Sequence, residues 1–170
     1  MRQKRYDPGG DSVADITGLR TRAATIADAA AIAKIYNEGI ADRIATFETE
    51  PRSAGKIAEW FTGRQLVIVV ETEAAGPVAF AASFPYSERS CYRGIGEFSV
   101  YVRRDFRGRG AGRVVLAALM EAARTAGLYK LTSRVFPENG ASRALLRGSV
   151  SRKSASTAVT GNWMVAGVIA

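Results

Sequence analysis

The stretch from Gly96 to Gly127 constrains the fold of this 170-residue chain more than any other. It opens with alternating residues that predict a β-strand, passes through the turn Arg107–Gly112 with glycine at every second position, and ends in an amphipathic helix. A strand, a glycine turn and a helix N-terminus present backbone N–H groups to an anion. Nearby arginines add charge that suits phosphates: Arg103, Arg104, Arg107, Arg109 and Arg113. An ordinary strand–turn–helix connection with a solvated basic face is the alternative interpretation.

The glycine spacing excludes two common nucleotide-binding motifs. No Lys-Ser or Lys-Thr pair follows Gly112, so the turn is not a P-loop. The G-x-G-x-G spacing also differs from the dinucleotide fingerprint, and no acidic residue closes a second strand about 20 residues further on. The turn therefore predicts an anion site of a different class.

Composition predicts one globular domain over residues 19–170, preceded by a disordered extension over residues 1–18. The absence of a long apolar run predicts no membrane segment and no secretory leader. The single cysteine, Cys91, excludes an internal disulfide and favours a cytoplasmic location. The net charge of +8 gathers near the glycine turn and after Asn139, without a basic arm. That distribution favours a small polyanion over nucleic acid as the partner.

Hydrophobic periodicity and capping residues predict alternating strands and helices. We expect strands at 19–24, 65–73, 77–84, 95–102 and 130–136, and helices from Thr25 or Asp28 to about 39, after Ser53, at about 111–126 and at 141–147. The strands at 65–73 and 77–84 are continuously apolar, which predicts burial on both faces. This order predicts an α/β (α+β) domain with a mixed sheet.

The glycine turn resembles the pyrophosphate motif [Gln/Arg]-x-x-Gly-x-[Gly/Ala] of the GCN5-related N-acetyltransferases (GNAT), because residues 107–112 match every defined position. Four further segments resemble the phosphinothricin-type members: residues 35–40, 46–51, 89–97 and 136–142. The resemblance implies a mostly antiparallel GNAT sheet flanked by helices, acetyl-CoA as cosubstrate and no metal. It also implies detoxifying acetylation of the amino group of a small amino-acid-like compound of the phosphinothricin, methionine sulfoximine or arsinothricin type.

The resemblance assigns cofactor contacts to the glycine turn, the central strand and one asparagine. The pyrophosphate would lie against Arg107, Gly108, Arg109, Gly110, Ala111, Gly112 and Arg113. The pantetheine arm would pair with the backbone of Val100, Tyr101 and Val102 as an added strand does. Asn139 resembles the asparagine that contacts CoA in the family, although a helix N-cap alone explains this residue equally well.

The resemblance assigns catalysis to Glu97, at the start of the central strand, as general base. The chain has no histidine, so a carboxylate is the natural choice. Ser142 is the candidate proton donor to the departing thiolate. Arg89 and Arg93 are candidates for binding an anionic group of the substrate. Four more residues are expected to line the pocket, of which Tyr36 and Phe47 fit a core position equally well: Tyr36, Asn37, Phe47 and Tyr92.

The resemblance stops after Arg147, and residues 139–170 contain no Asp or Glu. Residues 150–160 show no clear strand or helix pattern. Codons can be chosen for residues 148–165 so that a shifted reading frame gives LGFTEVGIYRRHGQLDG, close to what the family has there. We therefore treat 148–170 as atypical and frame-shifted by hypothesis, and expect a homodimer only where this region folds. The alternative functions are a protein or peptide N-acetyltransferase and a catalytically defective acyl-CoA-binding protein.

Overall fold

The computed structural model describes residues 18–149, 155–160 and 163–169. Most of the predicted N-terminal extension, residues 1–17, lies outside the described residues, as do 150–154, 161–162 and 170 in the atypical tail.

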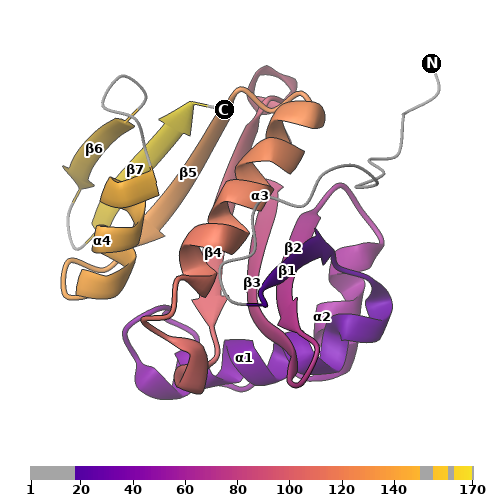
Figure 1. Ribbon diagram of the computed structural model, residues 1–170. Coiled ribbons are helices and arrows are strands. Elements are labelled where there is room, and N and C mark those ends of the chain that lie inside the picture. The colour runs from indigo at the N-terminus through magenta and orange to yellow at the C-terminus, as the bar shows by residue number, and fades with distance from the viewer. Residues whose placement is uncertain (1–17, 150–154, 161–162, 170) are drawn as a thin grey trace.

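Seven strands in the described ranges form one twisted sheet in the order β1-β2-β3-β4-β5-β7-β6 (Figure 1). All neighbouring strands are antiparallel except β4 and β5, which are parallel. The predicted mixed, mostly antiparallel sheet is confirmed. The strands are β1 (Arg20–Ala23), β2 (Leu66–Thr72), β3 (Gly76–Pro85), β4 (Ile95–Val102), β5 (Lys130–Val135), β6 (Ala155–Thr160) and β7 (Trp163–Ile169).

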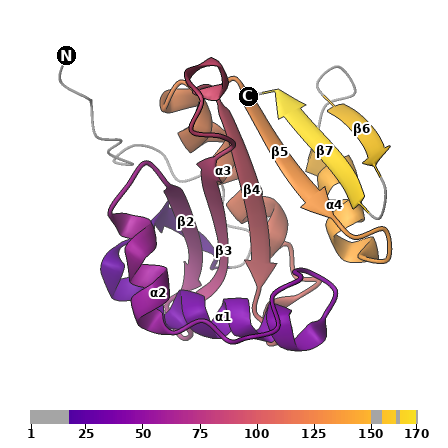
Figure 2. The same cartoon turned by 180° about the vertical axis from the view of Figure 1, so that it is seen from behind.

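Helices cover both faces of the sheet (Figures 1 and 2). One face carries α1 (Ala29–Asp42) and α2 (Ala54–Ala58), and the opposite face carries α3 (Ala111–Thr125) and α4 (Gly140–Ser149). Four short 3-10 turns complete the described elements: η1 (Ile26–Asp28), η2 (Glu59–Phe61), η3 (Ser90–Tyr92) and η4 (Arg104–Phe106).

Capping residues set the helix boundaries much as the sequence predicts. Thr25 and Asp28 form a capping box at η1, which runs directly into α1. The helix passes its predicted end by about one turn and stops where Arg43 takes a left-handed conformation, with φ of 57°. Ser53 accepts a hydrogen bond from the Lys56 amide at the start of α2.

The two central strands are buried on both faces, as their continuous apolar sequence predicts. Val69 and Phe80 pack towards α1, whereas Val70 and Ala81 pack towards α3. All four side chains are fully buried. Because the two apolar clusters share this rigid pair of strands, β4 has a fixed support on one edge.

We expected no strand in residues 150–160, and this expectation is wrong for part of that range. Residues Ala155–Thr160 form β6, which pairs with β7, and β7 in turn pairs with β5. The segment is composed of alanine, serine, threonine and one valine, so its hydrophobic alternation is weak. Pairing with a neighbouring strand, rather than local propensity, accounts for it.

Candidate functional site

The parallel strands β4 and β5 pair over only three residues and then separate. Their register joins Ile95 to Lys130, Gly96 to Leu131 and Glu97 to Thr132, and it ends there. Figure 2 shows the two strands diverging from that point. The β4 backbone beyond Glu97 therefore presents an edge that an extended, amide-bearing ligand can join as a strand would.

A cleft of about 420 Å³, part of it open to solvent, lies between the separated strands. It brings together predicted residues that are far apart in sequence, because β4, β5 and the start of α4 all meet there. Its lining is Ala45, Phe98, Ser99, Val100, Tyr101, Ser133, Arg134, Val135, Phe136, Asn139, Ser142, Leu145 and Leu146.

The loop between α1 and α2 meets one end of the cleft. The Asn139 side-chain amide donates a hydrogen bond of 2.9 Å to the Ile44 carbonyl. Phe47 packs edge-on against Phe136 with 4.6 Å between ring centroids, yet 63% of Phe47 remains exposed. Phe47 therefore lies beside the cleft with an apolar surface facing solvent, where it can contact a substrate.

The predicted anion turn has the backbone geometry that the sequence requires. Gly108 and Gly110 have φ of 74° and 85°, and no atom lies within 4 Å of a Cβ built on either. Gly110 is the N-cap of α3, whose first turn holds no acidic side chain. Within the described chain, no backbone hydrogen bond uses the amides of residues 108–112. These amides, at the N-terminus of α3, are available to bind an anion.

The arginines around this turn divide into two groups. Arg104 and Arg107 make ion pairs with Asp42 of α1 at 2.6 and 2.7 Å, and Arg103 pairs with Asp105 at 2.7 Å. Hydrogen bonds from Arg104, together with the nearby Arg107, lower the pKa of Asp42 despite its desolvation. The two Asp42 pairs fix the turn to α1, and all three arginines are committed to a carboxylate of the protein.

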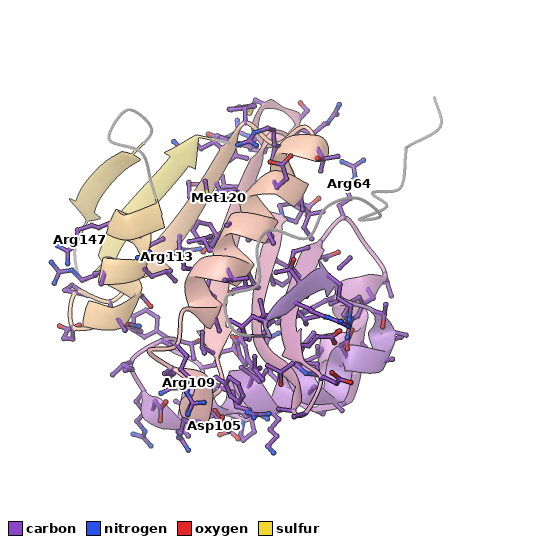
Figure 3. The ribbon with its side chains drawn as sticks, viewed as in Figure 1. Arg64, Asp105, Arg109, Arg113, Met120 and Arg147 are labelled. Atoms are coloured by element: carbon purple, nitrogen blue, oxygen red, sulfur yellow. The ribbon has the colours of Figure 1, made fainter. Side chains whose placement is uncertain are left out.

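Arg109 and Arg113 form the second group, and neither makes an ion pair with a described residue. Arg109 lies on the turn near Asp105, with its guanidinium 5.2 Å from the Phe106 ring (Figure 3). Arg113 lies on the first turn of α3, on the side of α4 (Figure 3). Of the arginines at this turn, these two therefore have charge available to an anion.

Glu97 lies where the strands part, and both of its carboxylate oxygens are bound by Arg134. The Arg134 Nε–Glu97 Oε1 and Nη2–Oε2 distances are 2.7 and 2.5 Å. These bonds raise the pKa of Arg134. Arg134 was not among the site residues predicted from the sequence. Glu97 is paired with Thr132, and Arg134, two residues further along β5, lies on the same face of the sheet. The sequence alone does not give this strand register.

Tyr36 and Asn37 lie on α1 and make structural contacts. The Tyr36 ring is 7% exposed and lies 4.7 Å from the Tyr101 ring, and its hydroxyl donates to Glu48 at 2.9 Å. The Asn37 side chain exchanges two hydrogen bonds with the Arg52 backbone. Of the two interpretations left open for Tyr36, the structure supports the core position, while Asn37 anchors the loop that carries Phe47.

The segment between β3 and β4 holds the other predicted substrate residues. Tyr92 contacts Tyr86 with 5.6 Å between ring centroids, and the Arg89 guanidinium lies 6.0 Å from the Tyr92 ring. Arg89 and Arg93 are exposed. This cluster follows β3 and precedes β4, so it lies at the Glu97 end of the cleft.

Asn139 caps α4, because its side-chain oxygen accepts from the Ser142 amide at 2.9 Å. Its amide group binds Ile44, so both polar ends of this buried side chain already have protein partners. The N-cap interpretation accounts for Asn139 without a cofactor. The predicted proton donor Ser142 lines the cleft beside it.

Comparison with known proteins identifies the family to which this chain belongs. The profile of the Acetyltransferase (GNAT) family matches residues 32–148. This chain belongs to the GNAT acetyltransferase family. An L-methionine sulfoximine/L-methionine sulfone acetyltransferase from Pseudomonas paraeruginosa is 36% identical over 130 residues, which cover 74% of this chain and 76% of that protein.

Solved GNAT structures share the fold. A phosphinothricin acetyltransferase from Sinorhizobium meliloti in complex with acetyl-CoA has a TM-score of 0.76 at 23% identity, covering 89% of this chain and 86% of its own. A ribosomal-protein-alanine N-acetyltransferase from Brucella melitensis has a TM-score of 0.77 at 27% identity, covering 88% and 99%. The predicted family and enzyme class are confirmed.

The described residues hold neither a candidate metal cluster nor a candidate membrane span. No group of three or more His, Cys, Asp or Glu residues there could hold a metal ion. No helix in the described ranges is long and apolar enough to cross a membrane. The expectation of a metal-free enzyme stays a prediction.

Proposed function

We propose that this GNAT enzyme transfers the acetyl group of acetyl-CoA to the amino group of a small amino-acid-like compound. One observation carries the proposal: a cleft between β4 and β5 has the anion turn beyond the Val102 end of β4 and a carboxylate, Glu97, at the other end. The 36% identity to a methionine sulfoximine and sulfone acetyltransferase supports the substrate class.

The residues present fit acetyl-CoA as cosubstrate. The amides of residues 108–112, with Arg109 and Arg113, suit the pyrophosphate. The β4 edge at Val100–Val102 suits the amide-bearing pantetheine arm, because β5 does not pair with it there. The thioester supplies an acetyl group activated for attack by an amine.

The protein's own groups then manage protons and charge. Glu97, at the point where the strands part, takes a proton from the acceptor ammonium and passes it to solvent. A carbon–nitrogen bond forms and the carbon–sulfur bond breaks, with its electron pair remaining on sulfur. The second nitrogen proton ends on that sulfur, and Ser142 in the cleft wall is the proposed relay. A β4 backbone N–H near Val100 is the proposed donor to the thioester oxygen.

The acceptor would lie on the α1 side of the cleft. Phe47 and Phe136 provide an apolar wall there. Tyr92 with Arg89 and Arg93 provides an aromatic and cationic wall at the Glu97 end, suited to an anionic group. A compact wall of this kind suits a small anionic amine.

Acetylation of a protein N-terminus is the second candidate function. The 27% identity to the ribosomal-protein-alanine N-acetyltransferase from Brucella melitensis favours it. Non-catalytic acyl-CoA binding is the third candidate, and the atypical region 148–170 favours it. We also infer a detoxifying, cytoplasmic enzyme that forms a homodimer where its C-terminal region folds, which light scattering on the purified chain would test.

The test of these alternatives follows CoA thiol release from acetyl-CoA with a panel of acceptors. The panel contains phosphinothricin, methionine sulfoximine, methionine sulfone, arsinothricin, common amino acids and a peptide with N-terminal alanine. We expect turnover with at least one of the amino-acid analogues and little with the peptide. Thermal stabilisation by CoA without turnover on any acceptor would instead favour the binding-only protein.

Glu97→Gln tests the assigned base. We expect a large fall in kcat while acetyl-CoA still stabilises the variant against heat, because the pyrophosphate turn is remote from residue 97. Glu73→Gln, in the exposed turn before β3, is the matched control and should retain wild-type kinetics. An unchanged kcat in Glu97→Gln would remove Glu97 from the mechanism.

A further inference from the structure

Arg134 has an unusual position for a residue with no assigned role. It lies two residues beyond the last β4–β5 pair, and it reaches across to Glu97 where the strands have begun to separate. Its side chain is 56% exposed and also lines the cleft, whereas the Glu97 side chain is 30% exposed. One face of this guanidinium is therefore committed to Glu97 while the group remains accessible from the cleft.

The ion pair opposes the function proposed for Glu97. Each Glu97 oxygen keeps a second lone pair, but a proton placed there removes the negative charge on which both guanidinium bonds depend. Weakening the pair leaves the Arg134 charge without its partner, at a modest cost because this side chain is 56% exposed. A second anion that occupies Arg134 removes most of this cost, because the bidentate contact is remade with another carboxylate.

An α-amino acid carries the groups that this exchange requires. Its carboxylate matches the guanidinium fork, and its ammonium is attached to the same carbon atom. A substrate carboxylate that replaces Glu97 on Arg134 therefore brings the ammonium next to the released Glu97. Arg89 is less suited to this role, because it lies over Tyr92 in the exposed segment and no described contact links it to Glu97.

We propose that Arg134 is the receptor for the carboxylate of the acceptor, and that binding of this carboxylate releases Glu97 from its ion pair to act as base. The inference rests on the proposed function and narrows its substrate class to amines with an adjacent anionic group. The released Glu97 oxygen takes one ammonium proton, and that proton leaves to solvent after acetyl transfer. No other reactant is needed.

The test compares methionine sulfone with its carboxamide, which keeps the amine and side chain but lacks the anion. In the wild type we expect kcat/KM to favour the acid by on the order of tenfold or more, the value of one charged hydrogen bond. Arg134→Gln should raise the KM for the acid about tenfold or more and abolish the preference, and Arg134→Lys should keep part of it.

Two readouts separate this role from a merely structural one. Because Glu97 is released permanently in Arg134→Gln, kcat for the carboxamide should be retained or rise, whereas a structural ion pair predicts a fall for both acceptors. The KM for acetyl-CoA should not change. Arg64→Gln removes an exposed arginine before β2, two strands away from β4, and should leave the acid preference intact.

A failure of the role proposed for Arg134 can be distinguished from a failure of the proposed function. If the wild type acetylates the carboxamide with the same kcat/KM as the acid, the proposed function stands and the role of Arg134 is overturned. An Arg134→Gln variant that retains the acid preference leads to the same conclusion. A wild type that acetylates neither compound, nor any amino acid of the panel, overturns the proposed function and this inference with it.

Discussion

Gly39 of α1 lies directly against the ring of Tyr101 on β4, so that a Cβ built on Gly39 would lie 2.6 Å from Tyr101 Cε1. The Tyr101 side chain is buried, and burial raises the pKa of its hydroxyl. The same ring contacts Tyr36 and Phe80. This close packing sets the distance between α1 and the strand that forms one wall of the cleft.

Gly39→Ala should therefore destabilise the fold although alanine is the better helix former. Overpacking a buried ring costs about 1–3 kcal/mol, of which about 1 kcal/mol is recovered as helix propensity. We expect an unfolding temperature lower by roughly 2–6 °C, measured by calorimetry. Gly55→Ala in the exposed α2, where the nearest atom lies 3.7 Å away, should be neutral or stabilising. Equal behaviour of both variants would contradict the packing argument.

Gly108→Ala tests the anion turn. Alanine at a φ of 74° costs about 1 kcal/mol, and its methyl group enters the open space beside the proposed pyrophosphate site. We expect the KM for acetyl-CoA to rise by on the order of tenfold. Gly76→Ala carries the same strain at a φ of 62° in the β2–β3 turn, also with open space around it. Gly76→Ala should lose similar stability but keep the wild-type KM for acetyl-CoA. If this KM rose equally in both variants, backbone strain alone would be responsible.

The contacts of Asp28 let us predict how the stability of the fold depends on pH. Its carboxylate binds Arg22 at 2.7 and 2.8 Å and accepts from the Thr25 amide, and the Arg22 bonds lower its pKa in the folded chain. A lowered folded-state pKa stabilises the fold above the unfolded value of about 3.9, and this contribution is lost as pH falls through the folded pKa. Urea titrations of the wild type should therefore show a steep loss of stability below about pH 4.

The variant Asp28→Asn should be less stable by about 2 kcal/mol at pH 7 and should lose less on acidification, since the titrating group is gone. Asp105→Asn is the matched control, because Asp105 pairs with Arg103 at the surface. It should leave the acid slope almost unchanged. Identical slopes for the wild type and Asp28→Asn would assign acid unfolding to other carboxylates.

Most of the fold could be predicted from the sequence, because the helix boundaries are set by contacts between residues close in sequence. Ser53, Asn139 and the glycine turn fix helix starts through contacts within a few residues. The site was predicted less completely, because the relevant contacts connect distant segments. Arg134 becomes visible only when the β4–β5 register places it two residues beyond Thr132, the partner of Glu97. Likewise, Arg104 and Arg107 resemble ligand arginines in the sequence, but Asp42 of α1 holds both.

Residues 148–170 begin where the match to the family ends. The family profile ends at residue 148, where the shifted-frame sequence LGFTEVGIYRRHGQLDG would continue it. In the present frame this region still supplies β7, which pairs with β5 from Lys130 to Val135, along the strand that carries Arg134. A hairpin of the wrong sequence would therefore reach the wall of the cleft and weaken both stability and acceptor turnover.

Sequencing the coding DNA should reveal codons at 148–165 that give this segment when shifted. A gene with the frame restored should produce a protein with an unfolding temperature several degrees higher and faster turnover of the panel acceptors. A gene recoded with synonymous codons in the present frame is the control and should behave as the original. Codons that cannot encode the segment in any frame would refute the shift and make residues 148–170 a native feature of this chain.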